Sequence, residues 1–111
     1  MQAIAYIHKN GFMHRDIKPE NFLISTKSIK LPGANTSQQI TNLKLADFGL
    51  TREVRLSGKF TEYVSTRWYR APELVLKAQA YGKPVDIFAL GAMMAELFIG
   101  RPVFPGRSES E

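Results

Sequence analysis

Residues 14–21 read His14-Arg15-Asp16-Ile17-Lys18-Pro19-Glu20-Asn21, and the rest of the chain is best interpreted outward from this octet. Before it, residues 2–10 carry apolar side chains at helical spacing, and Gly11 follows where such a helix would stop. After it, residues 21–24 form a short apolar run that is typical of a strand. We therefore expect the charged residues of the octet on a loop between a helix and a strand.

A second short strand is predicted over residues 43–46, and it can pair with residues 21–24 as a hairpin. The stretch between the two runs is rich in Ser, Thr, Gln, Asn and Lys and contains Pro32-Gly33, which is typical of a solvated surface loop. Long loops of this kind are either functional or without fixed structure. Nothing in residues 25–42 resembles a set of ligands, so we expect a surface loop without fixed structure.

Positive charge gathers in the segment that follows the hairpin. The chain has 15 Lys and Arg against 10 Asp and Glu, a formal net charge of +5. Between residues 52 and 70, five basic side chains stand against two acidic ones, a local balance of +3. The same segment shows no periodicity and contains the triplet Thr61-Glu62-Tyr63. A phosphate there would add roughly −1.5 to −2 charges and order the segment by pairing with arginines. Nucleic-acid binding is not needed to explain the charge.

Residues 85–99 predict a helix that is apolar in almost every direction. Such a helix is normally buried, and this one is too short to span a bilayer, so we expect it at the centre of a helical core. Asp86 lies near its start, where a carboxylate caps a helix. Gly100 and the prolines after it are expected to end the helix.

Length and composition exclude several classes of protein. The 111 residues suffice for one domain at most, and 44% hydrophobic with 23% charged residues is typical of a soluble globular protein. The absence of cysteine excludes a disulfide scaffold, a thiol nucleophile and Cys-ligated zinc. No apolar run is long enough to span a membrane, and no signal peptide is recognisable at the start. We expect a cytoplasmic or nuclear location and neither a membrane nor a nucleic-acid partner.

The octet resembles the catalytic loop of protein kinases, whose pattern is H-R-D-L-x-x-x-N. A chance match at six fixed positions has a probability on the order of one in ten million per position. Asp47-Phe48-Gly49 and Ala71-Pro72-Glu73 follow in the order that kinases have. The segment from Thr61 to Glu73 resembles the group of MAP kinases, cyclin-dependent kinases and their relatives. Within that group, Phe48 to Glu53 and Phe104-Pro105-Gly106 look most like the male germ cell-associated and intestinal-cell kinase branch.

The resemblance implies a serine/threonine kinase that uses ATP and Mg²⁺ to phosphorylate protein substrates. It makes Asp16 the acceptor of the proton of the substrate hydroxyl and Lys18 the side chain that offsets charge on the transferred phosphoryl group. It makes Asn21 and Asp47 ligands of Mg²⁺, which prefers oxygen donors. Asp86 is structural in the resembling fold, where it holds the catalytic loop through backbone hydrogen bonds.

The resemblance also implies activation by phosphorylation of Thr61 and Tyr63, by an upstream kinase or by autophosphorylation. It implies that Arg15 binds the phosphate of phospho-Thr61. It also implies that Arg67 and Arg70 bind the phosphate of phospho-Tyr63. Arg67 tends in this family to favour proline just after the phosphorylated residue, so we expect proline-directed activity.

By the same resemblance, residues 1–111 are part of a protein kinase domain, and the fold class is mainly α with a short β-hairpin, a fragment of the C-terminal lobe of an α+β fold. Its parts are the end of helix E, the catalytic loop, a metal-binding hairpin with an insertion over 26–42, an activation segment over 50–73 and the central helix 85–99. The glycine-rich loop and the lysine of the N-terminal lobe do not occur here, nor do the C-terminal helices.

We expect the isolated chain to be inactive for this reason, and to be an incomplete gene model or a genuine truncation. The alternative is a non-catalytic kinase lobe that acts as a binding or decoy module.

Overall fold

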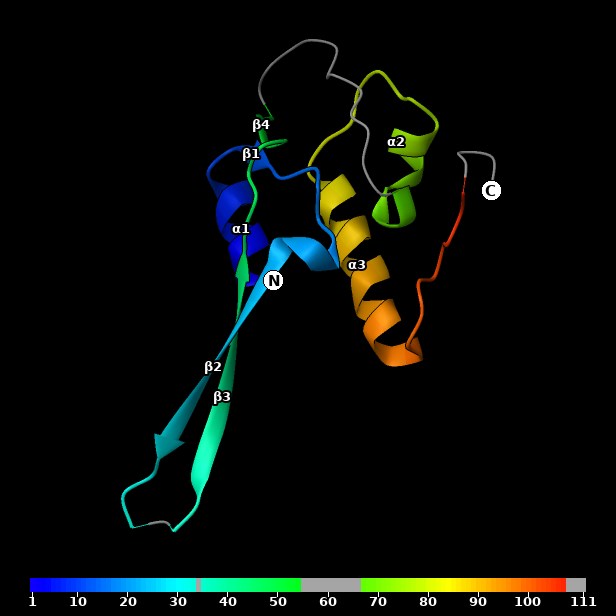
Figure 1. Ribbon diagram of the computed structural model, residues 1–111. Coiled ribbons are helices and arrows are strands. Elements are labelled where there is room, and N and C mark those ends of the chain that lie inside the picture. Colours follow the sequence, from blue (N-terminus) through cyan, green and yellow to red (C-terminus); the bar gives the residue numbers. More distant parts are fainter. Residues whose placement is uncertain (34, 55–66, 108–111) are drawn as a thin grey trace.

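The computed structural model describes residues 1–33, 35–54 and 67–107, with helices beside two small antiparallel sheets (Figure 1). In chain order the elements are α1 (Gln2–Lys9), β1 (Phe12–Met13), the 3₁₀ turn η1 (Pro19–Asn21), β2 (Phe22–Lys30), β3 (Ser37–Leu45), β4 (Arg52–Glu53), the 3₁₀ turn η2 (Arg67–Tyr69), α2 (Pro72–Val75) and α3 (Pro84–Ile99). The helix expected over 2–10 and the helix expected over 85–99 are both present. Thr61 and Tyr63 lie outside the described residues.

The chain leaves α1 by a turn that only a residue with positive φ adopts easily. Gly11 has φ +86°, and its amide donates to the carbonyl of His8 (3.2 Å). The next residues form β1, which pairs with β4 through Phe12↔Glu53 and Met13↔Arg52. This pairing was not predicted, because two residues on each side are too few to show a periodic pattern. It ties the segment after the hairpin to the segment before the octet.

The hairpin of β2 and β3 is much longer than the sequence predicts. The expected pairing at its base is present, with Ile24 opposite Leu43, but it continues to Lys30 opposite Ser37, so each strand has nine residues. The surface loop expected over residues 25–42 is therefore wrong, and so is the description of the hairpin as short. Its polar composition is that of a ribbon solvated on both faces, since every residue from Leu23 to Lys30 is exposed.

The core lies against residues 85–93 of α3. Its buried cluster consists of Ile4, Ile17, Tyr69, Ala89, Leu90, Ala92 and Met93. Phe22 and Leu45, which pair with each other at the base of the hairpin, pack against the cluster, so the hairpin is anchored at one end. Most residues of the cluster come from α1, η2 and α3 (Figure 1).

The C-terminal half of α3 departs from the predicted all-round burial. Leu97 is 78% and Phe98 87% exposed, whereas Val85 and Leu90 nearer the start are buried. Gly100 ends the helix with φ +77°, as expected of a glycine at this position. Among the described residues, no helix is both long enough and apolar enough to cross a membrane.

Candidate active site

The loop that carries the octet is fastened to α3 by the carboxylate of Asp86. The backbone amides of His14 and Arg15 donate to its two oxygens, each at 2.8 Å, and His8 Nε2 lies 2.7 Å from Oδ2. Asp86 is 1% exposed, and the hydrogen bonds compensate the cost of burying its charge. The bonds to the loop agree with the structural role expected for Asp86.

Two residues of the site have backbone angles that non-glycine residues rarely adopt. Arg15 has φ +69° and Asp47 has φ +57°. Each such conformation costs on the order of 1–3 kcal/mol and persists only where the surroundings impose it. For Arg15 the imposing contact is the bond from its amide to Asp86. Strained residues cluster at functional sites, and these two lie on the loop and on the segment after the hairpin.

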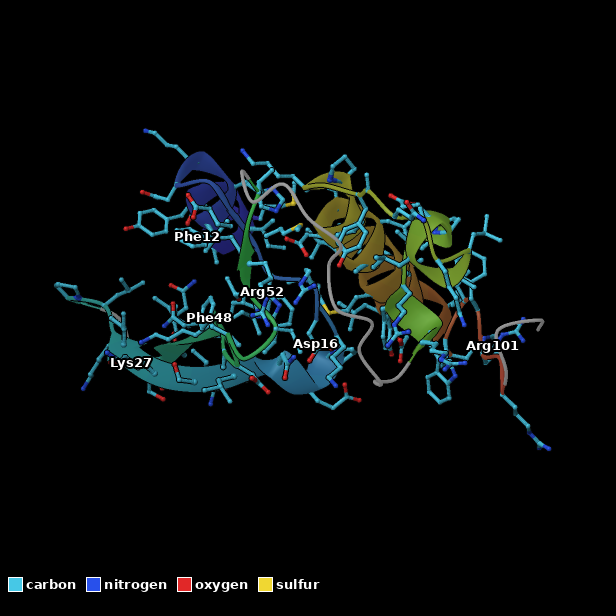
Figure 2. The ribbon with its side chains drawn as sticks, turned by 90° about the horizontal axis from the view of Figure 1, so that it is seen from above. Phe12, Asp16, Lys27, Phe48, Arg52 and Arg101 are labelled. Atoms are coloured by element: carbon cyan, nitrogen blue, oxygen red, sulfur yellow. The ribbon has the colours of Figure 1, made fainter. Side chains whose placement is uncertain are left out.

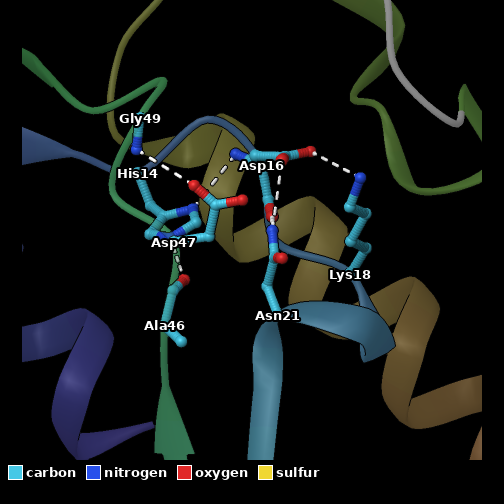
Figure 3. Close-up of polar contacts among 7 residues, drawn as sticks. All are labelled: His14, Asp16, Lys18, Asn21, Ala46, Asp47 and Gly49. Atoms are coloured by element: carbon cyan, nitrogen blue, oxygen red, sulfur yellow. Dashed lines mark hydrogen bonds and ion pairs between the residues drawn. The ribbon is translucent and has the colours of Figure 1, made fainter.

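His14 joins the octet to the base of the hairpin. Its Nδ1 accepts from the amide of Asp16 (3.2 Å), so the proton is assigned to Nε2, which then donates to the carbonyl of Ala46 (3.1 Å). The ring meets Phe48 edge to face, with centroids 5.3 Å apart. His14 is fully buried, whereas Phe48 is 51% exposed. The histidine therefore fixes the approach of the two segments on which Asp16 and Asp47 lie (Figure 3).

Asp16 is held from two sides by residues of its own loop (Figure 3). The side-chain amide of Asn21 donates to the backbone carbonyl of Asp16 (2.7 Å) and to its Oδ2 (3.1 Å). Lys18 Nζ lies 3.6 Å from Oδ1. The Asp16 side chain is 11% exposed, so the carboxylate is oriented and still accessible. These contacts bring together the three residues that the sequence analysis singled out in the octet.

Asp47 reaches the same place through the hairpin ladder. The amide of Ala46 donates to the carbonyl of Asn21 (2.8 Å), so Asp47 directly follows the residue that pairs with Asn21. Its Oδ1 accepts from the amide of Gly49 (3.2 Å), as the close-up shows (Figure 3). The site thus presents carboxylate and amide oxygens, the donors that Mg²⁺ prefers. The described residues contain no group of three or more His, Cys, Asp and Glu that would hold a metal by themselves.

Arg15 points away from these oxygens. Its guanidinium donates to the carbonyl of Leu50 through Nε (2.6 Å) and to the hydroxyl of Tyr81 (2.8 Å), and the residue is 3% exposed. Arg67 lies exposed in η2, and Arg70 follows it half-buried. Their expected phosphate partners, Thr61 and Tyr63, are outside the described residues.

The sequence analysis missed three residues that support the site. His8 binds Asp86 from α1, Tyr81 binds Arg15, and Glu96 accepts a hydrogen bond from the hydroxyl of Tyr69 (2.6 Å). Burial raises the pKa of Tyr69 well above its usual value near 10, and the bond to Glu96 raises it further. Each pair joins residues that are far apart in sequence, and a pattern in one sequence does not reveal such contacts.

Comparison with known proteins identifies the family of the chain. The family model described as protein kinase domain matches residues 1–111. The chain belongs to the protein kinase family. This kinase chain is 49% identical over 109 residues to the human serine/threonine-protein kinase MAK, and 49% identical over the same length to the mouse serine/threonine-protein kinase ICK. Each match covers 98% of the chain and 15% of the relative.

A plant relative places the chain in the same group of kinases. The rice protein named cyclin-dependent kinase F-3 is 48% identical over the full chain, which covers 22% of that protein. The resemblance to relatives of MAP kinases and cyclin-dependent kinases, and to the MAK and ICK branch, is confirmed. The chain spans about a fifth or less of the length of these relatives.

Proposed function

We propose that the protein containing this chain transfers the γ-phosphate of ATP to serine or threonine hydroxyls of protein substrates. The observation that carries the proposal is the Asp16 carboxylate, which is oriented by Asn21 and paired with Lys18 on a loop fastened to α3. Phosphoryl transfer asks a protein mainly to position a hydroxyl and to offset negative charge. A fixed carboxylate with an ammonium group 3.6 Å away supplies both within one loop.

Asp16 is the proposed acceptor of the hydroxyl proton. The two hydrogen bonds from Asn21 fix the carboxylate, so one oxygen can be directed at an incoming hydroxyl without a conformational search. Lys18 stays close enough to Asp16 to interact with the phosphoryl group that the same hydroxyl attacks. Its positive charge then stabilises the negative charge of the transferred group.

Asn21 and Asp47 are the proposed Mg²⁺ ligands. Because Nδ2 of Asn21 is used by Asp16, the amide oxygen is the atom left for a cation. Asp47 is exposed to solvent and directly follows Ala46, whose amide bonds to the carbonyl of Asn21. When bound, Mg²⁺ would neutralise charge on the phosphates of ATP.

We propose the activation scheme of the family for this protein as well. Phosphorylation of Thr61 and Tyr63, by an upstream kinase or by the protein itself, would supply anions for Arg15, Arg67 and Arg70. We further propose a preference for substrates with proline after the phosphorylated residue. Residues 1–111 are proposed to belong to the C-terminal lobe, and the chain alone is expected to be inactive, because the glycine-rich loop over the phosphates does not occur in it.

The test is Asp16→Asn in the full-length protein, measured as phosphate transfer from radiolabelled ATP to a serine/proline peptide. Loss of a general base is expected to lower kcat by roughly 10²–10⁴-fold, while ATP affinity stays within about twofold. Glu20→Gln is the matched control, since Glu20 is an exposed acid of the same loop. Undiminished transfer in Asp16→Asn would overturn the proposal. An unchanged cellular effect of the inactive variant would favour the binding or decoy module instead.

A further inference from the structure

We propose that the free edge of β2 is a docking site for an extended, acidic segment of a partner protein. This inference goes beyond the proposed phosphate transfer and does not depend on it. The hairpin projects from the helices as a two-stranded ribbon, and among the described residues it packs against the core through Phe22 and Leu45 at its base (Figure 1). Each strand has nine residues, which is about 30 Å of ladder at 3.3–3.4 Å per residue.

The ladder register identifies which backbone groups of β2 face outward. The amide of Ala46 bonds to the carbonyl of Asn21 at the base, so this pair is hydrogen-bonded. Hydrogen-bonded and non-hydrogen-bonded pairs alternate along an antiparallel ladder. The N–H and C=O groups of Thr26, Ser28 and Lys30 therefore point away from β3. An exposed row of this kind is the template to which an added strand pairs.

The positive charge of the ribbon favours a partner segment with acidic side chains. Lys27, Lys30 and Lys44 are all exposed, and residues 22–45 contain neither Asp nor Glu. Among the described residues, none of the three lysines is in an ion pair. Two of them lie on β2, and Figure 2 shows Lys27 well apart from Asp16. An acidic side chain on an added strand would be a cross-strand neighbour of Lys27.

Apolar side chains beside Lys27 add contact area for such a strand. Ile29 lies on the same face of the ribbon two residues further, and Ile40 is opposite Lys27 on β3. Ile29 is 42% and Ile40 40% exposed. A segment that carries an acidic and a β-branched residue two positions apart, and therefore on the same face, would match the lysine with its charge and the isoleucines with its apolar group.

Two other occupants fit the ribbon less well. A second copy pairing edge to edge would bring Lys27 and Lys30 near their own counterparts, and lysines on an edge strand are a known means of preventing that. Single-stranded RNA is bound by aromatic platforms and arginine, and residues 23–45 contain neither an aromatic side chain nor an arginine. The open backbone edge has no use in binding RNA, whereas it is what a peptide strand needs.

The experiment measures binding of a fluorescent peptide that repeats Glu-Thr-Val-Thr, with glutamate and valine on one face, to the full-length protein by anisotropy at low salt. Ser28→Pro removes one outward N–H from the β2 edge, and Gln39→Pro removes the corresponding N–H from the β3 edge at the residue paired with Ser28. We expect Ser28→Pro to weaken binding by about tenfold or more and Gln39→Pro to leave it within about twofold. Equal effects of the two prolines, or none, would overturn the choice of edge and the proposal with it.

A second variant tests the charge without changing the backbone. Lys27→Glu combined with Lys30→Glu should abolish binding of the glutamate peptide and create binding of the same peptide with lysine in place of glutamate. Binding by the unchanged protein should also fall as salt is raised. No binding of the acidic peptide, binding that ignores the charge reversal, or stronger binding of polyuridine RNA than of the peptide would each overturn the proposal.

Discussion

The Asn21 side chain is bonded to Asp16 twice, to its backbone carbonyl at 2.7 Å and to its carboxylate at 3.1 Å. Asn21 is 6% exposed and ends the turn η1, so its own position is fixed by the start of the hairpin. One residue thus orients the proposed base with its amide nitrogen and offers its amide oxygen to a cation. Replacing Asn21 should therefore have two effects, one on kcat and one on the magnesium requirement, and each can be measured separately.

In the full-length protein, Asn21→Ala should remove both functions of this side chain. We expect kcat to fall by about 10²-fold or more, because the Asp16 carboxylate loses its bond, and we expect half-maximal activity to require more Mg²⁺. A magnesium titration of phosphate transfer measures both quantities. Asn42→Ala, at an exposed asparagine of the hairpin, is the control and should change neither. A lower kcat with an unaltered magnesium requirement would contradict the role of Asn21 as a ligand.

The two acids Asp86 and Asp47 should separate stability from activity. Asp86→Asn replaces a buried carboxylate that receives hydrogen bonds from His14, Arg15 and His8, and it should lower the free energy of unfolding by about 2–4 kcal/mol. Asp47→Asn changes an exposed side chain, so the unfolding free energy should stay within about 0.5 kcal/mol while magnesium-dependent activity falls.

Urea unfolding of the full-length protein, followed by circular dichroism, gives the first quantity, and the peptide phosphorylation assay gives the second. If Asp86→Asn were as stable as the unchanged protein, the hydrogen bonds that join Asp86 to His14 and Arg15 would not contribute to stability. If Asp47→Asn kept full activity at low magnesium, its assignment as a ligand would be wrong.

The site was predictable because its residues are consecutive or follow recognisable motifs. Asp16, Lys18 and Asn21 lie within one octet, and Asp47 begins the triplet that follows the second strand, so a single sequence places them together by resemblance. The supporting contacts were not predictable in the same way. His8 and Asp86 are separated by most of the chain, and nothing local in either sequence context indicates that they meet.

The error over residues 25–42 has a physical origin. Sequence analysis detects a strand by the alternation of apolar and polar side chains, and that alternation arises only where one face is buried. Beyond Phe22 and Leu45 none of the described residues of the ribbon packs against the core, so its residues are mostly polar and do not alternate. Thr26, Ile29 and Ile40 were the available signal, since β-branched residues favour strands on both sides of the Pro32-Gly33 turn.

The bond between Tyr69 and Glu96 should make stability depend on pH in the alkaline range. The pKa of Tyr69 is raised above 10 in the folded protein, chiefly by burial and then by Glu96. Above pH 10 the unfolded chain therefore loses a proton that the folded chain retains, and stability falls as the pH rises further. Tyr69→Phe should remove this part of the pH dependence, and at neutral pH it should cost about 1–2 kcal/mol through the lost hydrogen bond.

Urea unfolding at neutral pH and again above pH 10 measures both effects. Tyr6→Phe serves as the control, because Tyr6 is 69% exposed on α1 and its hydroxyl has solvent as an alternative partner. An alkaline loss of stability that is the same with and without the Tyr69 hydroxyl would refute the assignment of that loss to Tyr69.

Shortening the hairpin should separate its outer part from the catalytic site. Replacing residues 26–41 by an Asn-Gly turn joins Ser25 to Asn42, which form a hydrogen-bonded pair and so suit a two-residue connection. The anchoring pair of Phe22 and Leu45 and the bond between Asn21 and Ala46 are kept. We expect the unfolding free energy to stay within about 1 kcal/mol and phosphate transfer within about twofold, because those of the deleted residues that the structure describes are exposed.

The same variant should no longer bind the glutamate peptide, because the outward row of β2 is gone. Replacing only residues 30–37 by Asn-Gly is the control, since it introduces the same turn while keeping Lys27 and Ser28 in the ladder, and it should retain most of the binding. A loss of phosphate transfer by about tenfold or more in the longer deletion, but not in the control, would mean that the pairs of residues 26–29 with 38–41 are required to position Asn21 and Asp47.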